Sequence, residues 1–166
     1  MIREYANAMD LPAEYYTAIG EMMFRWAQLE HQMQEIIWRA MRIDNKQGRT
    51  LTVGMGSKVL CATLKTLTRQ WLITAKDKQR ANSIAKGAGK IAEFRNYLAH
   101  GSWEFPSGGD QKNLHLIYMK ETAHRILPKA VKHTPEEIRK KAGQLRQLNK
   151  RAQDLIYDLD MRNEMS

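Results

Sequence analysis

The chain has 166 residues, 43% of them hydrophobic, which is enough to bury one core, so a single domain over residues 1–166 is expected. Its one cysteine, Cys61, excludes an internal disulfide, and no Cys/His group has zinc-site spacing, so we expect no metal and no cofactor. The formal net charge of +9 favours a polyanionic partner such as RNA.

The first residues, Met1-Ile2-Arg3-Glu4-Tyr5, lack the apolar run of a signal peptide. No stretch approaches the roughly 20 apolar residues of a membrane span. A cytoplasmic protein with no membrane partner is therefore expected.

Residues 12–41 are predicted to form a long amphipathic helix, because apolar side chains recur at helical spacing. These residues are Met22, Trp26, Leu29, Met33, Ile36 and Ala40. They are expected to fill a helical core rather than to line a ligand pocket. Glu30 flanks this stripe. It is either an ordinary boundary residue, which we favour, or a partner for Arg95.

A loop is predicted at 43–56, because glycines there interrupt the helical pattern. Two further helices are predicted over residues 58–74 and 78–100, with Ser57 and Asp77 as their N-caps. The residues expected to face inward are Leu60, Leu64, Leu67, Trp71, Ile84, Ala88, Ile91, Phe94 and Leu98. The small residues Gly87, Ala88 and Gly89 would let a neighbouring helix approach closely.

A β-hairpin insertion is predicted at about 102–120, because residues 102–105 and 114–118 are rich in aromatic and β-branched side chains and flank a turn at 106–110. The last helix is predicted to begin with a capping box from Thr134 to Glu137. Its inward residues are Ile138, Ala142, Leu145, Leu148, Ala152, Leu155 and Leu159. These elements predict an all-α fold, an up-and-down four-helix bundle with one small hairpin.

Charge is unevenly distributed along the chain. Residues 124–151 carry nine Lys/Arg against two Glu, a net +7, whereas the first 41 residues carry three Arg against six acidic residues, a net −3. The basic segment is either a solvated face or a surface that guides RNA, and we weigh these equally. An RNA-guiding surface predicts binding that weakens as salt rises.

The end of the third helix carries the groups best suited to chemistry, Arg95, Asn96 and His100. Asn96 and His100 are an i, i+4 pair on one face, whereas Arg95 lies about 140° from His100, with Gly101 expected as a left-handed C-cap. Arginine matches phosphate oxygens, and histidine exchanges protons near neutral pH. The alternative is that Arg95 and His100 only complement the helix dipole.

The run Arg95-Asn96-Tyr97-Leu98-Ala99-His100 followed by Gly101 resembles the Arg-Asn-x-x-x-His signature of the HEPN superfamily. The resemblance implies a HEPN-like helical domain and a metal-independent endoribonuclease. In such an enzyme the ribose 2′-hydroxyl attacks, leaving a 2′,3′-cyclic phosphate and a 5′-hydroxyl. His100 would be the general acid or base, and Arg95 would hold the phosphate. Asn96 would orient His100 or the phosphate.

One histidine cannot comfortably be acid and base at once, so the resemblance also implies a homodimer with a composite active site. A role as a toxin restrained by an antitoxin protein, or as a defence effector, is expected. The alternative function is a non-catalytic helical module that binds RNA, a nucleotide or a protein partner. Tyr97 and Trp103 either stack on bases or, as we favour, pack the hairpin.

Overall fold

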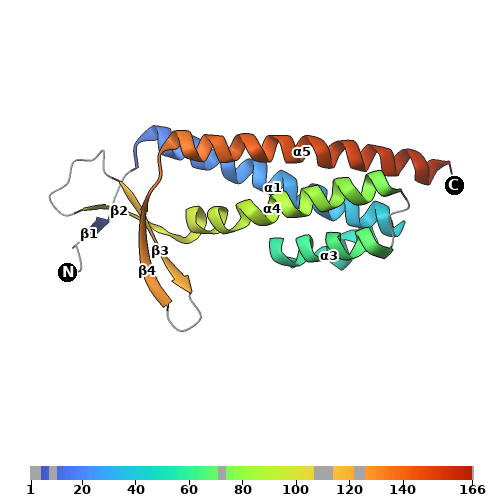
Figure 1. Ribbon diagram of the computed structural model, residues 1–166, viewed down its shortest axis with the longest axis horizontal. Coiled ribbons are helices and arrows are strands. Elements are labelled where there is room, and N and C mark those ends of the chain that lie inside the picture. Colours follow the sequence, from blue (N-terminus) through green and yellow to red (C-terminus); the bar gives the residue numbers. More distant parts are fainter. Residues whose placement is uncertain (1–4, 8–10, 71–73, 107–113, 122–125, 166) are drawn as a thin grey trace.

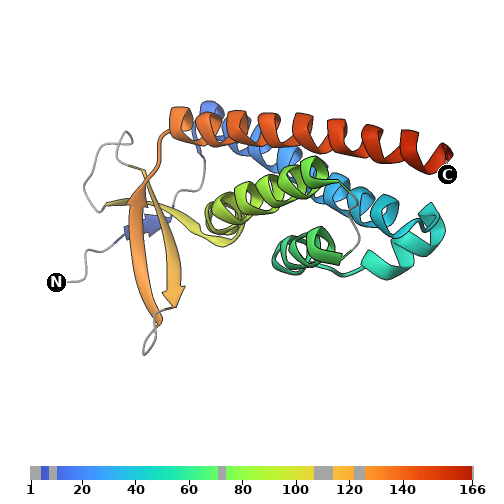
Figure 2. The same cartoon turned by 45° about the vertical axis from the view of Figure 1, so that its right-hand side comes forward.

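The computed structural model describes residues 5–7, 11–70, 74–106, 114–121 and 126–165. Within these parts the chain is mostly helical and carries a small antiparallel sheet. The elements in chain order are β1 (Tyr5–Asn7), α1 (Ala13–Met41), α2 (Asn45–Thr52), α3 (Ser57–Gln70), α4 (Ala75–His100), β2 (Ser102–Pro106), β3 (His115–Glu121), β4 (Ile126–Lys132) and α5 (Pro135–Glu164). The strands gather at one end of the helices, where α4 ends and α1 and α5 begin (Figures 1 and 2).

The helices pack in an order that differs from the predicted up-and-down path. α1 and α5 run in parallel, because Arg146 lies 3.4 Å from Glu21 near one end and Arg39 lies 2.7 Å from Asp160 near the other. α4 runs in the opposite direction, toward the sheet (Figure 1). The prediction is wrong between α1 and α3, which run in the same direction, because α2 first leads the chain back along α1.

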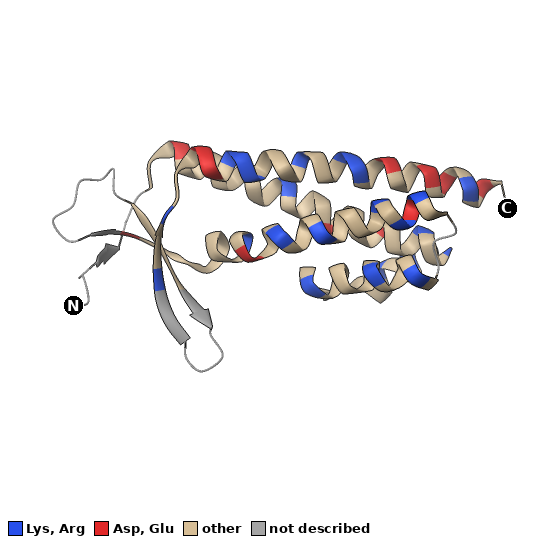
Figure 3. Ribbon diagram, in the orientation of Figure 1, with Lys and Arg blue, Asp and Glu red and all other residues tan. Residues whose placement is uncertain are grey.

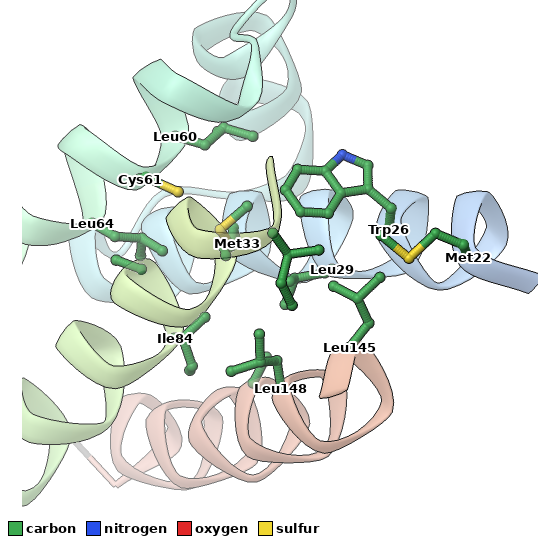
Figure 4. Packing of buried hydrophobic residues seen from close by; sticks show 14 of the residues in the cluster. Met22, Trp26, Leu29, Met33, Leu60, Cys61, Leu64, Ile84, Leu145 and Leu148 are labelled. Carbon is green, nitrogen blue, oxygen red and sulfur yellow. The ribbon is translucent and has the colours of Figure 1, made fainter. Parts of the chain in front are cut away.

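The core lies among α1, α3, α4 and α5 and confirms most of the predicted apolar stripes (Figure 4). Met22, Trp26 and Leu29 are completely or almost completely buried. Every inward residue predicted for the last helix is buried as well. Burial of each large apolar side chain contributes roughly 1.5–3 kcal/mol relative to exposure. Phe94 departs from the prediction, since it is only half-buried, and Trp71 lies outside the described residues.

Helix α2 replaces part of the loop that was predicted at 43–56. Asp44 caps it by accepting N–H bonds from Lys46 and Gln47, and the Gln47 side chain completes a capping box. Gly48 does not break the helix. A Cβ there would lie 2.4 Å from Trp38 Cγ, so the glycine allows the buried indole to pack against the backbone.

The starts of α4 and α5 test the predicted caps. Thr74, not Asp77, caps α4, because the Thr74 side chain accepts the backbone N–H of Asp77 at 3.1 Å. Asp77 lies in the first turn and is 1% exposed. The capping box of Thr134 and Glu137 at α5 is confirmed.

The sheet has strand order β1-β2-β3-β4, and all three pairs are antiparallel. The predicted hairpin of β2 and β3 is confirmed, with Trp103 opposite Leu116. The turn predicted between them lies largely outside the described residues. Strand β4 was not predicted, and its Pro128 is tolerated because β4 is at the edge of the sheet.

Aromatic side chains of the sheet pack against aromatic side chains of the helices. Tyr97 of α4 stacks on Tyr118 of β3 with ring centroids 3.6 Å apart, and Tyr15 of α1 meets Trp103 of β2 edge-on at 5.3 Å. Tyr97 and Trp103 therefore pack the sheet, as we favoured from the sequence. The sheet holds the last turns of α4 in place.

Candidate active site

Arg95, Asn96 and His100 lie in the last two turns of α4, which ends at His100. The following Gly101 has φ −81° and ψ 157°, so the predicted left-handed cap is wrong. The glycine serves close packing instead. A Cβ at this position would lie 2.6 Å from Leu116 Cδ1 and 2.6 Å from the Tyr97 carbonyl oxygen, so a larger residue would push β3 away from the end of α4.

The Arg95 side chain points toward α1 and is 26% exposed. Its guanidinium carbon lies 5.7 Å from the ring centroid of Trp26, within cation–π range, and its Nη2 lies 3.8 Å from Glu30 Oε2. Arg95 Nε is buried and has no hydrogen-bond partner among the described residues. The guanidinium is thus anchored by a ring and a carboxylate but keeps unused donors.

Glu30 connects three helices at this site. It faces Arg95 of α4 with one carboxylate oxygen and accepts a 2.6 Å hydrogen bond from Ser57 Oγ with the other. Ser57 is the first residue of α3 rather than a cap outside it. The alternative that we disfavoured from the sequence, a pair between Glu30 and Arg95, is therefore the arrangement observed.

Asn96 continues the site toward solvent. Its Oδ1 accepts a 3.0 Å hydrogen bond from Arg95 Nη1, and the Asn96 side chain is exposed. The guanidinium of Arg95 therefore contacts Trp26 and Glu30 of α1 and, through Nη1, the exposed Asn96 of its own helix. His100 follows Asn96 by four residues and is therefore on the same face.

His100 is exposed on the last turn of α4. Among the described residues it has no hydrogen bond or ion pair with Arg95 or Asn96. The chain therefore brings Arg95 and Asn96 together and leaves the His100 imidazole accessible. An accessible imidazole on the last turn and a partly sheltered guanidinium one turn before it are groups that can act on a phosphodiester.

Tyr97 lies between these residues in sequence but is not a candidate for proton transfer at neutral pH. Partial burial and a hydrogen bond to Glu93 raise the pKa of Tyr97 to about 12. The hydroxyl therefore stays protonated, and the ring is occupied by the stack on Tyr118. Its part is to fix the orientation of the helix end.

The sequence identified Arg95, Asn96 and His100 but gave Trp26 only a core role. The Trp26 side chain is 1% exposed, and its indole nitrogen points away from the centre of the apolar cluster (Figure 4). Trp26 and Glu30 are four residues apart on α1, so they share a face. That spacing was the available signal for a shared contact with Arg95.

The described basic residues of segment 124–151 lie on β4 and on α5 as far as Arg151, near the middle of that helix, and the remainder of α5 is more acidic (Figure 3). Residues 124 and 125 lie outside the described residues. Within the part of the chain that the structure describes, no three His, Cys, Asp or Glu side chains are grouped to hold a metal ion. No described helix is long and apolar enough to span a membrane.

No family model, no curated protein and no solved structure matches the chain.

Proposed function

We propose that the chain is a HEPN-like, metal-independent endoribonuclease that acts as a homodimer and serves as a toxin or defence effector. The observation that carries the proposal is the arrangement at the end of α4. An arginine anchored by Glu30 and Trp26 is bonded to Asn96, and Asn96 shares an exposed face with His100. The four long helices around one core are compatible with a HEPN-like four-helix bundle in which α2 is an addition.

The proposed reaction uses each group for one task. Arg95 neutralises the non-bridging oxygens as negative charge builds on phosphorus, and Asn96 orients the Arg95 guanidinium. His100 takes the proton from the ribose 2′-hydroxyl or gives one to the leaving 5′-oxygen. The products are a 2′,3′-cyclic phosphate and a 5′-hydroxyl.

A second protomer supplies the second imidazole in this proposal. A two-fold interface that includes α4 would place both copies of His100 near one phosphodiester. The two glycines of α4 differ in a way that supports this surface. A Cβ at Gly87 would lie 2.6 Å from the Leu148 side chain of α5, whereas a Cβ at Gly89 would meet nothing within 4 Å. Gly89 thus lies on a face open to close approach.

Cleavage in EDTA is the direct test. We expect the purified protein to cut single-stranded RNA and to leave cyclic phosphate ends, and His100→Ala to slow the reaction by about 10²–10⁴-fold, the usual contribution of general acid–base catalysis. His31→Ala is the matched control, since its imidazole is 57% exposed on α1. Equal cleavage by the two variants would refute the assignment.

Two further measurements separate the parts of the proposal. Adding excess His100→Ala protein to the original protein is expected to lower the activity per original chain if two chains share the site, because each mixed dimer carries only one of the two imidazoles. Growth arrest on expression, relieved by His100→Ala, is expected for a toxin. Salt-sensitive RNA binding without cleavage would instead favour the non-catalytic module.

A further inference from the structure

A pocket of about 460 Å³ opens on the other side of the motif, between α4, β4 and α5. It lies within the roughly 300–1,000 Å³ range of pockets that hold small organic ligands. The residues that define its chemistry are Phe94, Lys132, His133, Glu137, Lys140 and Lys141. Phe94 immediately precedes Arg95 and is about 120° from His100 around the helix, so the pocket is distinct from the candidate active site.

Phe94 gives the pocket an aromatic surface. The ring is half-buried and meets the His133 imidazole edge-on at 5.1 Å, so it is held in one orientation. Lys141 Nζ lies 5.9 Å from the centroid of the same ring. An aromatic surface beside an ammonium group can take a flat ring and a negative charge together.

The charge of the pocket is predominantly positive. Lys132 comes from β4, whereas Lys140 and Lys141 come from α5, so the ammonium groups reach the pocket from two elements. Glu137 is the acidic residue of the lining, and its Oε2 is already engaged. It lies 3.4 Å from His133 Nδ1 and accepts the backbone N–H of Thr134 at 3.3 Å.

We propose that this pocket binds one unpaired nucleotide of an RNA strand, with the base against Phe94 and the flanking phosphates at the lysines. Unpaired bases stack on aromatic side chains, and lysines bind phosphate as point charges. Lysines on two elements suit successive phosphates of a strand better than a single phosphate group. That the strand is RNA rests on the proposed function. Phe94 and His100 are about 9 Å apart along the helix axis, so one strand can reach both.

Binding to a fluorescent single-stranded RNA, followed by anisotropy in EDTA, tests the pocket. All variants carry His100→Ala, so cleavage does not interfere. Phe94→Leu keeps an apolar side chain but removes the ring, and we expect it to weaken binding about five- to tenfold, as loss of one base stack does. Phe24→Leu is the control, because that ring is 64% exposed on α1.

An abasic version of the RNA identifies what the ring recognises. We expect Phe94→Leu to leave binding of the abasic strand unchanged, because phosphate contacts are retained. Lys140→Ala is expected to reduce the slope of log affinity against log salt by about 0.7, the value for one phosphate contact on a single strand. Lys46→Ala removes an exposed lysine of α2, outside the pocket and outside the basic segment 124–151, and is expected to change the affinity less than twofold.

Several results would overturn the proposal. These are no RNA binding by the parent protein, equal affinity of the Phe94→Leu and Phe24→Leu variants, or equal effects of Lys140→Ala and Lys46→Ala. Competition by free mononucleotides as strong as by the strand would also overturn it, in favour of a small-molecule site. If Phe94→Leu fails to fold by circular dichroism, Lys140→Ala decides, since that side chain is exposed. Ring-dependent binding without cleavage by the unmodified protein would refute only the nuclease.

Discussion

The charged residues at the two ends of α4 have different surroundings. At the start of the helix, the buried carboxylate of Asp77 accepts a hydrogen bond from Thr74 and lies 2.5 Å from Arg162 Nη1 of α5. Arg80 forms an ion pair with Asp158, which is also on α5. At the other end, Arg95 lies 3.8 Å from its carboxylate partner, and its Nε is buried without a partner among the described residues. His100, five residues further along α4, is exposed.

The difference separates a structural charge cluster from a candidate site. A buried carboxylate with close donors on several sides stabilises the fold and has little capacity for a ligand. A guanidinium whose carboxylate partner is 3.8 Å away can donate from its outer N–H groups to a phosphate without first breaking a close ion pair. The comparison therefore predicts stability effects at the start of α4 and activity effects at its end.

Among the substitutions that compare the two ends of α4, the largest effect is expected for Arg95→Lys. The substitution keeps the positive charge but removes the planar fork that matches two phosphate oxygens, so RNA cleavage is expected to fall about a hundredfold. Stability is expected to change by less than about 1 kcal/mol, because the pair with Glu30 is long and partly exposed. Initial cleavage rates and thermal melts measure the two effects.

Arg80→Lys is the matched control at the other end of the same helix, where the guanidinium bonds to Asp158. It is expected to leave the cleavage rate within twofold of the original. Similar losses of activity in both lysine variants would show that the two ends do not differ in the way proposed.

A smaller but measurable effect is expected for Asp77→Asn, which we predict to destabilise the fold by about 2–3 kcal/mol with cleavage unchanged. The variant keeps the shape but leaves Arg162 without its buried counter-charge. Chemical denaturation at pH 7 measures the loss.

The stability difference between the original protein and Asp77→Asn is expected to depend on pH. Burial raises the pKa of Asp77, but hydrogen bonds from Arg162 and Thr74 lower it by more, so the net pKa lies below the ordinary value of 3.8. The stabilisation is therefore fully present above pH 3.8 and is lost as the pH falls through the lowered pKa. The stability gap between the original protein and Asp77→Asn should narrow below pH 3.8. A constant gap down to pH 2 would contradict the assigned ion pair.

The smallest effect is expected for Glu30→Gln, because Glu30 acts through Arg95. The amide can still accept the bond from Ser57, but it no longer attracts the guanidinium, so kcat is expected to fall about threefold to tenfold with KM little changed. Glu35→Gln on the same helix, which lies 4.0 Å from Arg39, should leave both constants unaltered. An unchanged kcat in Glu30→Gln would remove Glu30 from the site.

Much of the helical structure follows from local sequence. The apolar stripe of α1 and the Thr134–Glu137 box of α5 were predicted correctly, because periodicity and capping involve residues within a few turns of one another. The same local logic failed at Gly48, which was interpreted as a breaker. Its reason for being glycine is the indole of Trp38, which only the folded chain brings against it.

The sheet shows more clearly which features local sequence does not predict. No strand was predicted at β4, since its lysines and Pro128 are untypical of a strand. Residues 126–132 nevertheless form a strand, because they pair with β3 from His115 to Glu121. The long-range backbone hydrogen bonds of this pairing outweigh the weak local strand propensity. This pairing also brings Lys132 and His133 next to Phe94.

The sequence by itself determined the long helices and the shared face of Asn96 and His100, because both depend on the 3.6-residue repeat of the α-helix. Tertiary packing alone decided that Arg95 turns toward Trp26 and Glu30, and that Phe94 lines a cationic pocket rather than the core. These contacts join segments far apart in the chain. Their geometry depends on how α1, α4, α5 and β4 are stacked, and no local repeat specifies that stacking.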